Sequence, residues 1–406
     1  MSDTSLFPAG MAEPLAQAYR DAFGQDAPGR VLGVVSPGRT EIAGNHTDHE
    51  GGEVIAGAVD RYVCGLFAPR DDRRIRLASE GYGMVELDAA DDEPRAGERT
   101  TTAALVRGLA AGFHARGYGC DGGGFDAVVR SEVPAGSGLS SSAAFELLVA
   151  QALNHLWAGG MLDALELARM AQEAEHAYFG KPCGLMDQAS VALGGIAHMD
   201  FRDPEAPTVE RLGFDFAACG YAICLVAVGA DHAANTDDYA AVPAEMRAVA
   251  RRYGAERLCE VDEARVLHDL PQIRTELGDR AALRALHYFR EDRLVQGRAK
   301  ALTTGDMATF LELTRRSGAS SAMYLQNVSA GSVASQPAMV ALAVAEELLG
   351  DRGAVRIHGG GFGGTIQAFV RLEEAEAFCR SMDKALGGEA AAAHAIDGKG
   401  ARAQWL

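Results

Sequence analysis

The order of apolar segments along this chain predicts an α+β protein with two domains. Strand-like and helix-like segments follow one another in mixed order, without the regular strand–helix alternation of a parallel α/β sheet. The chain has 406 residues, whereas a single apolar core rarely grows beyond roughly 250–300 residues. We therefore expect an N-terminal domain over residues 1–205 and a C-terminal domain over residues 206–406.

The N-terminal half contains most of the predicted strands. Short apolar runs predict strands over residues 31–36, 54–59, 62–67, 84–87 and 125–129, the first of them ending at Pro37. Apolar residues at helical spacing predict helices over residues 15–23, 101–116, 143–157 and 162–177. Strands therefore dominate the first 130 residues, and helices follow them.

The C-terminal half is richer in helices. Strands are predicted over residues 221–228, 355–358 and 365–372, and the segment 208–216 opens this half. Helical spacing predicts helices over residues 244–254, 262–267, 281–303, 307–317 and 335–349. The alanine cluster at 390–393 is expected to form a helix or a surface turn.

Composition excludes several classes of protein. The chain carries 38 basic and 56 acidic residues, a net charge of −18 that argues against nucleic acids or anionic membranes as partners. No stretch approaches the ~20 apolar residues of a membrane span, and residues 1–10 lack the features of a signal peptide. The seven cysteines are scattered, without zinc-site spacing. We expect a cytoplasmic enzyme with small-molecule partners, monomeric or, as the alternative, dimeric.

Residues 133–146, VPAGSGLSSSAAFE, form a loop suited to binding phosphate. Gly136 and Gly138 allow the backbone to turn and approach a ligand closely. The helix that opens near Leu139 has free N-terminal amides, which attract anions. The spacing is not that of a P-loop, and no lysine follows. The alternative is an ordinary turn before a serine-capped helix.

Four ordered segments resemble the GHMP sugar and metabolite kinases. They are VVSPGRTEIAGNHTDHEGGEVIAGAVD at 34–60, the serine loop, EHAYFGKPCGLMDQASVALGG at 175–195 and VRIHGGGFGGTIQAFV at 355–370. The first resembles the galactokinase branch, which carries P-G-R followed by G-E-H-T-D-Y, with Asn45 here in place of Glu and His49 in place of Tyr. The resemblance implies the GHMP kinase fold, its active site in the cleft between two domains, and an ATP-dependent sugar 1-kinase.

The resemblance also implies roles for individual residues. Asp187 matches the catalytic carboxylate that faces the sugar hydroxyl, and Arg39 matches the arginine that contacts this carboxylate and the transferring phosphoryl group. Ser142 and Glu175 match the Mg²⁺ ligands. The predicted ATP-binding residues are Pro134, Gly136, Ser137, Gly138, Leu139, Ser140, Ser141 and Ser142. The alternatives are a helix cap for Asp187, a surface ion pair for Arg39 and a solvated helix acid for Glu175.

The third signature is a glycine run. Five of the six residues at 359–364 are glycine, which is costly in regular structure unless another group must approach the backbone closely. The resemblance places this run in the cleft, opposite the nucleotide phosphates. The alternative is a flexible hairpin.

The resemblance assigns the sugar contacts to Asn45, His46, Asp48, Gly184 and Tyr239. An amide at residue 45 can accept a hydrogen bond from a C6 hydroxyl, but it also donates and carries no charge. We therefore expect D-galactose as the substrate, with galacturonate or N-acetylgalactosamine as alternatives. A non-catalytic sugar- and ATP-binding regulator is the alternative of another class. The motifs N-H-T-D-H and C-G-L-M-D-Q disfavour the mevalonate kinase branch.

Overall fold

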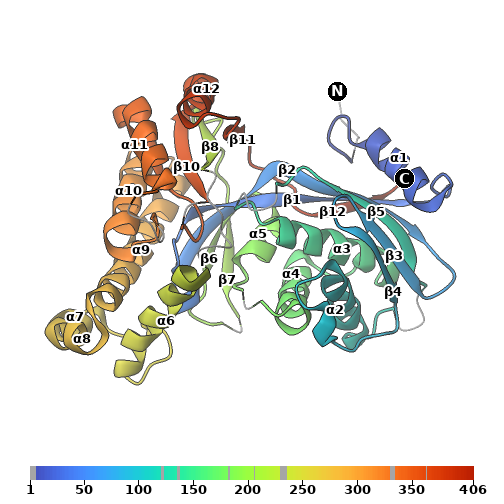
Figure 1. The fold of residues 1–406 in the computed structure, drawn as a ribbon, viewed down its shortest axis with the longest axis horizontal. Coiled ribbons are helices and arrows are strands. Elements are labelled where there is room, and N and C mark those ends of the chain that lie inside the picture. The colour runs from blue at the N-terminus through green and yellow to red at the C-terminus, as the bar shows by residue number, and fades with distance from the viewer. Residues whose placement is uncertain are drawn as a thin grey trace.

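The chain forms two layered regions that lie side by side (Figure 1). The computed structural model describes residues 6–119, 123–134, 138–181, 183–204, 206–228, 236–329, 334–362 and 364–406. Strands and helices follow in mixed order along these residues, which confirms the predicted α+β class. Among the described residues, no helix combines the length and the apolar character that a membrane crossing requires.

A large sheet forms the first region. Its strands lie in the order β12, β1, β2, β5, β3 and β4, while β6 pairs with β2 and β7 pairs with β6. Strands β3 and β5 are parallel, and β1 and β2 are antiparallel. The strands span Leu32–Ala43 (β1), Glu53–Pro69 (β2), Arg74–Ser79 (β3), Gly83–Asp88 (β4), Phe125–Ser131 (β5), Ile196–Asp200 (β6), Thr208–Leu212 (β7) and Arg402–Trp405 (β12).

Helices cover both faces of this sheet. Figure 1 shows α2 to α5 on one face and α1 on the other. These helices span Ala12–Phe23 (α1), Thr102–Ala115 (α2), Ser141–Trp157 (α3), Ala164–Ala174 (α4) and Met186–Leu193 (α5). Leu15 and Tyr19 of α1 pack in one apolar cluster with Val35 of β1. Because both faces are covered, every residue of β1 is buried.

Strand β1 does not end at Pro37, where the sequence predicted its end. It continues to Ala43, with a shift in its pairing with β2 between Pro37 and Gly38. A bulge accommodates a proline inside a strand because one residue there is left out of the hydrogen-bond ladder. The continuation carries Arg39 into the interior. The predicted strands at 54–59 and 62–67 likewise form the single strand β2.

A smaller sheet in the order β11, β8, β10, β9 forms the second region. Its strands span Tyr221–Ala227 (β8), Ala354–Ile357 (β9), Thr365–Arg371 (β10) and Ala391–His394 (β11). The alanine cluster at 390–393, expected to be helix or turn, therefore contributes to a strand that pairs with β8. The helices span Thr236–Arg252 (α6), Glu263–His268 (α7), Leu270–Leu277 (α8), Asp279–Thr304 (α9), Met307–Ser320 (α10), Pro337–Leu349 (α11) and Ala375–Leu386 (α12).

The two regions share part of their apolar core. The rings of Phe216, Phe310 and Phe369 contact one another and belong to the same cluster as the core of the large sheet. The C-terminal strand β12 also returns to pair with β1. The first region thus contains residues from the end of the chain, and the boundary at residues 205 and 206 stays a prediction.

Candidate active site

Asp187 and Arg39 form the centre of the candidate site. Asp187 lies in the first turn of α5 and Arg39 lies in β1. The guanidinium binds the carboxylate through two hydrogen bonds, Nε to Oδ1 at 2.7 Å and Nη2 to Oδ2 at 2.9 Å. Burial alone would raise the pKa of Asp187, but the charge and hydrogen bonds of Arg39, with the Ser140 hydroxyl, hold this pKa below its usual range. Asp187 is therefore ionised, and Arg39 is not a surface residue.

Arg39 also contacts the predicted phosphate loop. Its Nη1 donates to the carbonyl of Gly138, and its backbone N–H donates to the carbonyl of Leu139 at 3.0 Å. Gly138 has a φ of +76°, a conformation that glycine adopts without strain. The same arginine thus joins the acid on α5 to the loop before α3.

The serines of the loop do not form an ordinary helix cap. Ser140 is the N-cap of α3, but its φ is +55° and its hydroxyl donates to Asp187. The Ser140 side chain does not cap the first amides of α3. These amides are therefore available to bind an anion. Pro134 is exposed at the start of the loop. The predicted residues Gly136 and Ser137 lie outside the described residues.

Ser142 and Glu175 lie together, as the predicted metal site requires. Ser142 Oγ is 3.4 Å from Glu175 Oε1, and adjacent ligands of an octahedral Mg²⁺ lie about 3 Å apart, given Mg–O distances near 2.1 Å. Glu175 is buried at the start of a π-helical turn, Glu175–Phe179, a distortion that often marks functional sites. The oxygen donors fit Mg²⁺, and the alternative of a solvated helix acid is wrong for Glu175.

A second buried acid, Glu146, was not predicted. Ser142 Oγ donates to Glu146 Oε1 at 2.5 Å, and Gln188 Nε2 bridges Glu146 and Glu175 at 2.9 and 2.8 Å. Burial and the neighbouring Glu175 raise the pKa of Glu146 to about 8. The spacing of Ser142 and Glu146, four residues apart on one helix face, is the signal that could have revealed the pair.

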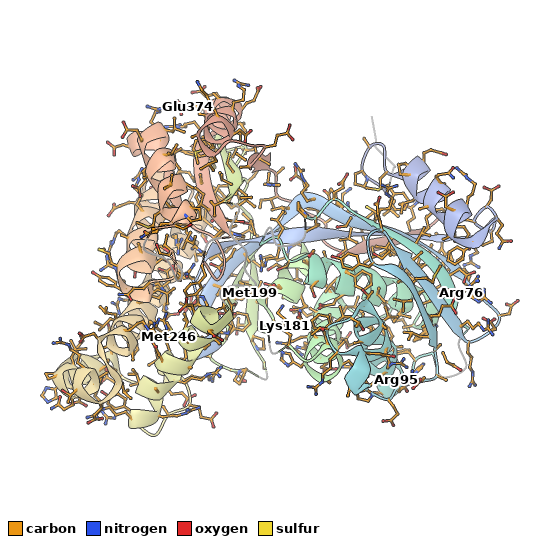
Figure 2. All side chains as sticks on the ribbon, in the orientation of Figure 1. Arg76, Arg95, Lys181, Met199, Met246 and Glu374 are labelled. Carbon is orange, nitrogen blue, oxygen red and sulfur yellow. The ribbon has the colours of Figure 1, made fainter. Side chains whose placement is uncertain are left out.

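Two further neighbours of Glu175 come from the loop before α5. Lys181 Nζ lies 2.9 Å from Glu175 Oε1, and the Cys183 thiol donates to Oε2 at 2.7 Å. Figure 2 shows Lys181 at the edge of the helical layer nearest the second region. Lys181 therefore contributes positive charge to a site whose serine loop has no lysine.

The predicted sugar contacts form two adjacent pairs. A Cβ on Gly184 would lie only 2.7 Å from Asp48 Oδ2, so the glycine lets the Asp48 carboxylate approach the loop before α5. The His46 and Tyr239 rings are 5.1 Å apart. His46 is buried, and its Nε2 lies 2.9 Å from the carbonyl of Gly360. Burial and His49 lower the pKa of His46 to about 3, so the ring is neutral.

Asn45 uses its amide group within the protein. Its Nδ2 donates to the carbonyl of Gly359 at 2.8 Å, and its Oδ1 accepts from Asn327 Nδ2 at 2.6 Å. His287 Nε2 donates to the Asn45 backbone carbonyl at 3.0 Å, and Asn45 is fully buried. A contact between Asn45 and the C6 end of a sugar stays a prediction, and it would compete with these bonds.

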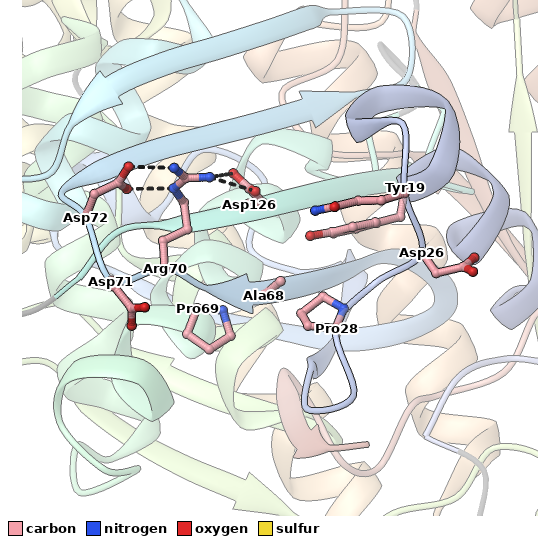
Figure 3. A pocket seen from close by; sticks show the side chains of 10 residues that line it. Tyr19, Asp26, Pro28, Ala68, Pro69, Arg70, Asp71, Asp72 and Asp126 are labelled. Atoms are coloured by element: carbon pink, nitrogen blue, oxygen red, sulfur yellow. Dashed lines mark hydrogen bonds and ion pairs between the residues drawn. The ribbon is translucent and has the colours of Figure 1, made fainter.

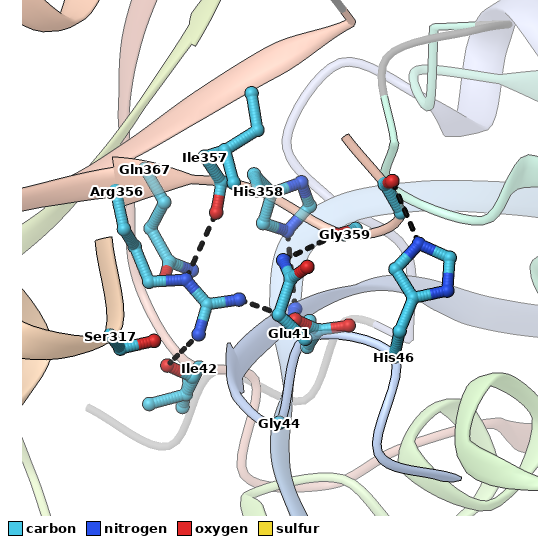
Figure 4. Close-up of polar contacts among 12 residues, drawn as sticks. Glu41, Ile42, Gly44, His46, Ser317, Arg356, Ile357, His358, Gly359 and Gln367 are labelled. Atoms are coloured by element: carbon cyan, nitrogen blue, oxygen red, sulfur yellow. Dashed lines mark hydrogen bonds and ion pairs between the residues drawn. The ribbon is translucent and has the colours of Figure 1, made fainter. Parts of the chain in front are cut away.

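Two glycines of the run, Gly359 and Gly360, accept hydrogen bonds from Asn45 and His46, just after β1 (Figure 4). A Cβ on Gly360 would collide with the Tyr239 ring, and one on Gly361 would collide with the backbone of Asn327. Nearby, the Arg356 guanidinium binds the Glu41 carboxylate, and both side chains are buried. These close contacts explain Gly360 and Gly361 and do not support a flexible hairpin there, while Gly363 lies outside the described residues.

A separate surface hollow of about 590 Å³ lies at the other end of the large sheet (Figure 3). Tyr19 and Arg70 line it, and the Arg70 guanidinium already binds both Asp72 and Asp126. None of the predicted site residues lines this hollow. Its cation is neutralised by the protein, so the hollow is not the candidate active site.

Comparisons with known proteins agree with this geometry. The family models "GHMP kinases N terminal domain" and "Galactokinase galactose-binding signature" match residues 104–195 and 17–69, which contain Asp187 and Arg39 respectively. A galactokinase of Streptomyces coelicolor is 30% identical over 379 residues, covering 92% of this chain and 93% of the relative. A structure of Lactococcus lactis galactokinase complexed with galactose matches with a TM-score of 0.82 at 26% identity, covering 97% of this chain and 99% of that chain. A mevalonate kinase shares the fold, with a TM-score of 0.65 at 13% identity over 90% and 99% of the two chains.

Proposed function

Because this chain belongs to the galactokinase family of the GHMP kinases, we propose that it transfers the γ-phosphoryl group of ATP to the C1 hydroxyl of D-galactose. One observation carries the proposal: the Arg39 guanidinium binds Asp187 through two hydrogen bonds and the Gly138 carbonyl through a third. Asp187, the acid that faces the sugar hydroxyl in this proposal, and the phosphate loop are thereby both bound by the Arg39 guanidinium. Phosphoryl transfer depends mainly on such positioning and on stabilising charge.

Asp187 acts on the sugar hydroxyl. Its pKa is low, so in the ground state it accepts a hydrogen bond from the C1 hydroxyl and aims the oxygen at phosphorus. The oxygen–phosphorus bond then forms as the bond to ADP breaks, and the hydroxyl proton passes to Asp187. Arg39 stays charged throughout because a guanidinium does not lose its proton in proteins. The arginine can therefore stabilise charge on the phosphoryl group during transfer.

Ser142 and Glu175 hold Mg²⁺ in this proposal. The ion, when bound, would neutralise charge on the nucleotide phosphates. Ser142 supplies a hydroxyl oxygen and Glu175 a carboxylate oxygen, and Lys181 and Gln188 fix the orientation of Glu175. The free amides at the start of α3 bind the phosphates from the other side.

The sugar lies at His46, Asp48, Gly184 and Tyr239. Asp48 accepts from sugar hydroxyls, and the neutral His46 and Tyr239 rings offer apolar surface with polar atoms at their edges. The alternative of galacturonate depended on Asn45 receiving a C6 carboxylate. One Nδ2 proton of Asn45 is donated to Gly359 and its Oδ1 accepts from Asn327, so the buried amide would have to give up these partners to turn toward a carboxylate, and this alternative is not favoured.

A sugar panel tests the proposal. ADP release should be measured with ATP, Mg²⁺ and one of D-galactose, galacturonate, N-acetylgalactosamine, arabinose or glucose. We expect the highest kcat/KM with D-galactose. A higher value for another sugar would replace the substrate, and no ADP release with any sugar would favour a non-catalytic regulator.

The substitution Asn45→Glu tests the C6 end of the site. The carboxylate would face the Gly359 carbonyl in place of a donor, leaving two acceptors together, which costs about 1–3 kcal/mol of stability. We expect a lower thermal midpoint and a lower kcat/KM for galactose and galacturonate alike. Improved galactose turnover would instead show that residue 45 reaches the C6 hydroxyl. Asn154→Asp, another buried amide that bonds a backbone carbonyl, is the control for stability.

We further expect a cytoplasmic location, a monomer or dimer, and a domain boundary at residues 205 and 206.

A further inference from the structure

His358 lies between the small sheet and the phosphate loop, and the transfer step proposed above does not use it. It follows β9 directly and precedes the glycine run (Figure 4). Its backbone N–H donates to the Thr365 carbonyl at 3.0 Å, which fixes the main chain. The residue is only 3% exposed. A polar ring so deeply buried needs partners for both of its nitrogens.

The hydrogen bonds of Nε2 define the tautomer of this ring. The backbone N–H of Glu41, which can only donate, lies 3.1 Å from His358 Nε2. Thr40 Oγ1 is 3.0 Å away, and it accepts from Gln367 Nε2, so its own proton is free for Nε2. Nε2 is thus an acceptor, and the ring proton must be on Nδ1. Burial and the charges of Arg39 and Arg356 lower the pKa of His358 well below its usual value, in keeping with a neutral ring.

The Nδ1–H group points at the phosphate loop. Among the described residues it has no hydrogen-bond partner, although it is buried. A Cβ on Gly138 would lie 2.9 Å from Nδ1, so the glycine leaves this donor uncovered on the side of the loop. The carbonyl of Gly138 is the one that accepts from Arg39. An unpaired donor therefore lies beside the uncapped amides of α3 and the cation of the site.

We propose that His358 Nδ1–H donates a hydrogen bond to a phosphate oxygen of the nucleotide bound at the loop of Gly138 and Ser140. The proposal rests on the proposed function, because it needs a nucleotide at this loop. A bound phosphate supplies the missing partner of a buried donor, and bonds to charged acceptors are the strong ones. The Nε2 bonds to Thr40 and Glu41 keep the donor aimed at the loop.

Two substitutions separate this role from a structural one. His358→Gln places an amide oxygen near the position of Nε2, so it keeps an acceptor for Glu41 but removes the donor at Gly138. His358→Asn places an amide nitrogen near the position of Nδ1, so it keeps the donor and removes the acceptor. His114→Gln is the matched control, because His114 stacks on Trp157 away from the loop.

The measurements are the thermal midpoint and the Kd of a non-hydrolysable ATP analogue, determined without sugar. We expect His358→Gln to keep its thermal midpoint and to raise the Kd about 10- to 100-fold. We expect His358→Asn to lose stability and keep the affinity. A glutamine variant with wild-type affinity would overturn the proposal. If that variant does not fold, ¹⁵N NMR of His358 in the wild-type protein is the deciding measurement. The chemical shift of Nδ1 should change when the ATP analogue binds, and an unchanged shift would overturn the proposal. Failure of the sugar panel would refute the proposed function alone.

Discussion

Asp187, which is half-buried, and the buried pair Glu146–Glu175 are acids in one site, yet their surroundings differ in charge. Asp187 is bound on both oxygens by the Arg39 guanidinium. Among the described residues, Glu146 and Glu175 form a single ion pair, that of Glu175 with Lys181. The uncharged Gln188 side chain bridges the two acids. Accordingly the pKa of Asp187 is lowered, whereas that of Glu146 is raised to about 8.

This difference supports the proposed division of roles, in which Asp187 serves the sugar and Glu175 serves the metal. The charge of Asp187 is already neutralised, so the carboxylate is free to orient a neutral hydroxyl. Lys181 can neutralise only one of Glu146 and Glu175, which is in keeping with the raised pKa of Glu146, and a divalent cation bound there would allow both acids to ionise. The local balance of charge is thus consistent with the two proposed roles.

The largest effect is expected for Asp187→Asn. An amide cannot take the hydroxyl proton, and it leaves Arg39 without its counter-charge, so kcat should fall about 10²- to 10⁴-fold. Binding of an ATP analogue should persist, because the loop and α3 are unchanged. The measurement is steady-state ADP release with galactose, alongside calorimetric binding.

Asp21→Asn is the control for this change, since Asp21 is an exposed acid on α1. If Asp187→Asn folds and retains near-normal kcat, the catalytic role of the acid is wrong. Loss of analogue binding as well would assign Asp187 to the nucleotide.

A smaller effect is expected for Glu175→Gln. The amide keeps an oxygen ligand but loses the charge, so the Mg²⁺ concentration for half-maximal rate should rise roughly tenfold, since such an ion is held by few protein ligands. Glu173→Gln is a closely matched control, two residues away on α4 and exposed, where Glu173 pairs with Arg116. Equal Mg²⁺ titrations of the two variants would remove Glu175 from the metal site.

The site residues that lie within the four family motifs could be predicted from the sequence. Asp187, Arg39, Ser142 and Glu175 lie in short segments of fixed spacing, and the structure brings them into one site. Other contacts around the site could not be predicted, because Asn327, which bonds Asn45, and His358, which bonds Glu41, reach the site through the second region, far along the chain. No local pattern reports such long-range contacts.

The fold shows the same limit. Periodicity identified most helices and strands, but Pro37 misled the prediction because a bulge, formed by pairing with β2, permits a proline inside β1. Helices α8 and α12 and strands β3, β6 and β12 were not predicted. Strand β12 is short and depends on β1 for its pairing, and this tertiary contact overrides local propensity.

The smallest effect is expected for the pH dependence of stability. The pKa of Glu146 is raised to about 8 from an ordinary value of 4.5, so the native state holds this proton more tightly than the unfolded chain does. Its contribution to stability is therefore complete below the ordinary pKa, and it is lost as the pH rises through about 8. Without Mg²⁺ or nucleotide, the thermal midpoint should fall by a few degrees more in wild type than in Glu146→Gln between pH 6 and about 8.5. Glu173→Gln should follow wild type. Parallel curves for wild type and Glu146→Gln would mean that Glu146 is ionised across this range, and the charge contrast with Asp187 would then be lost.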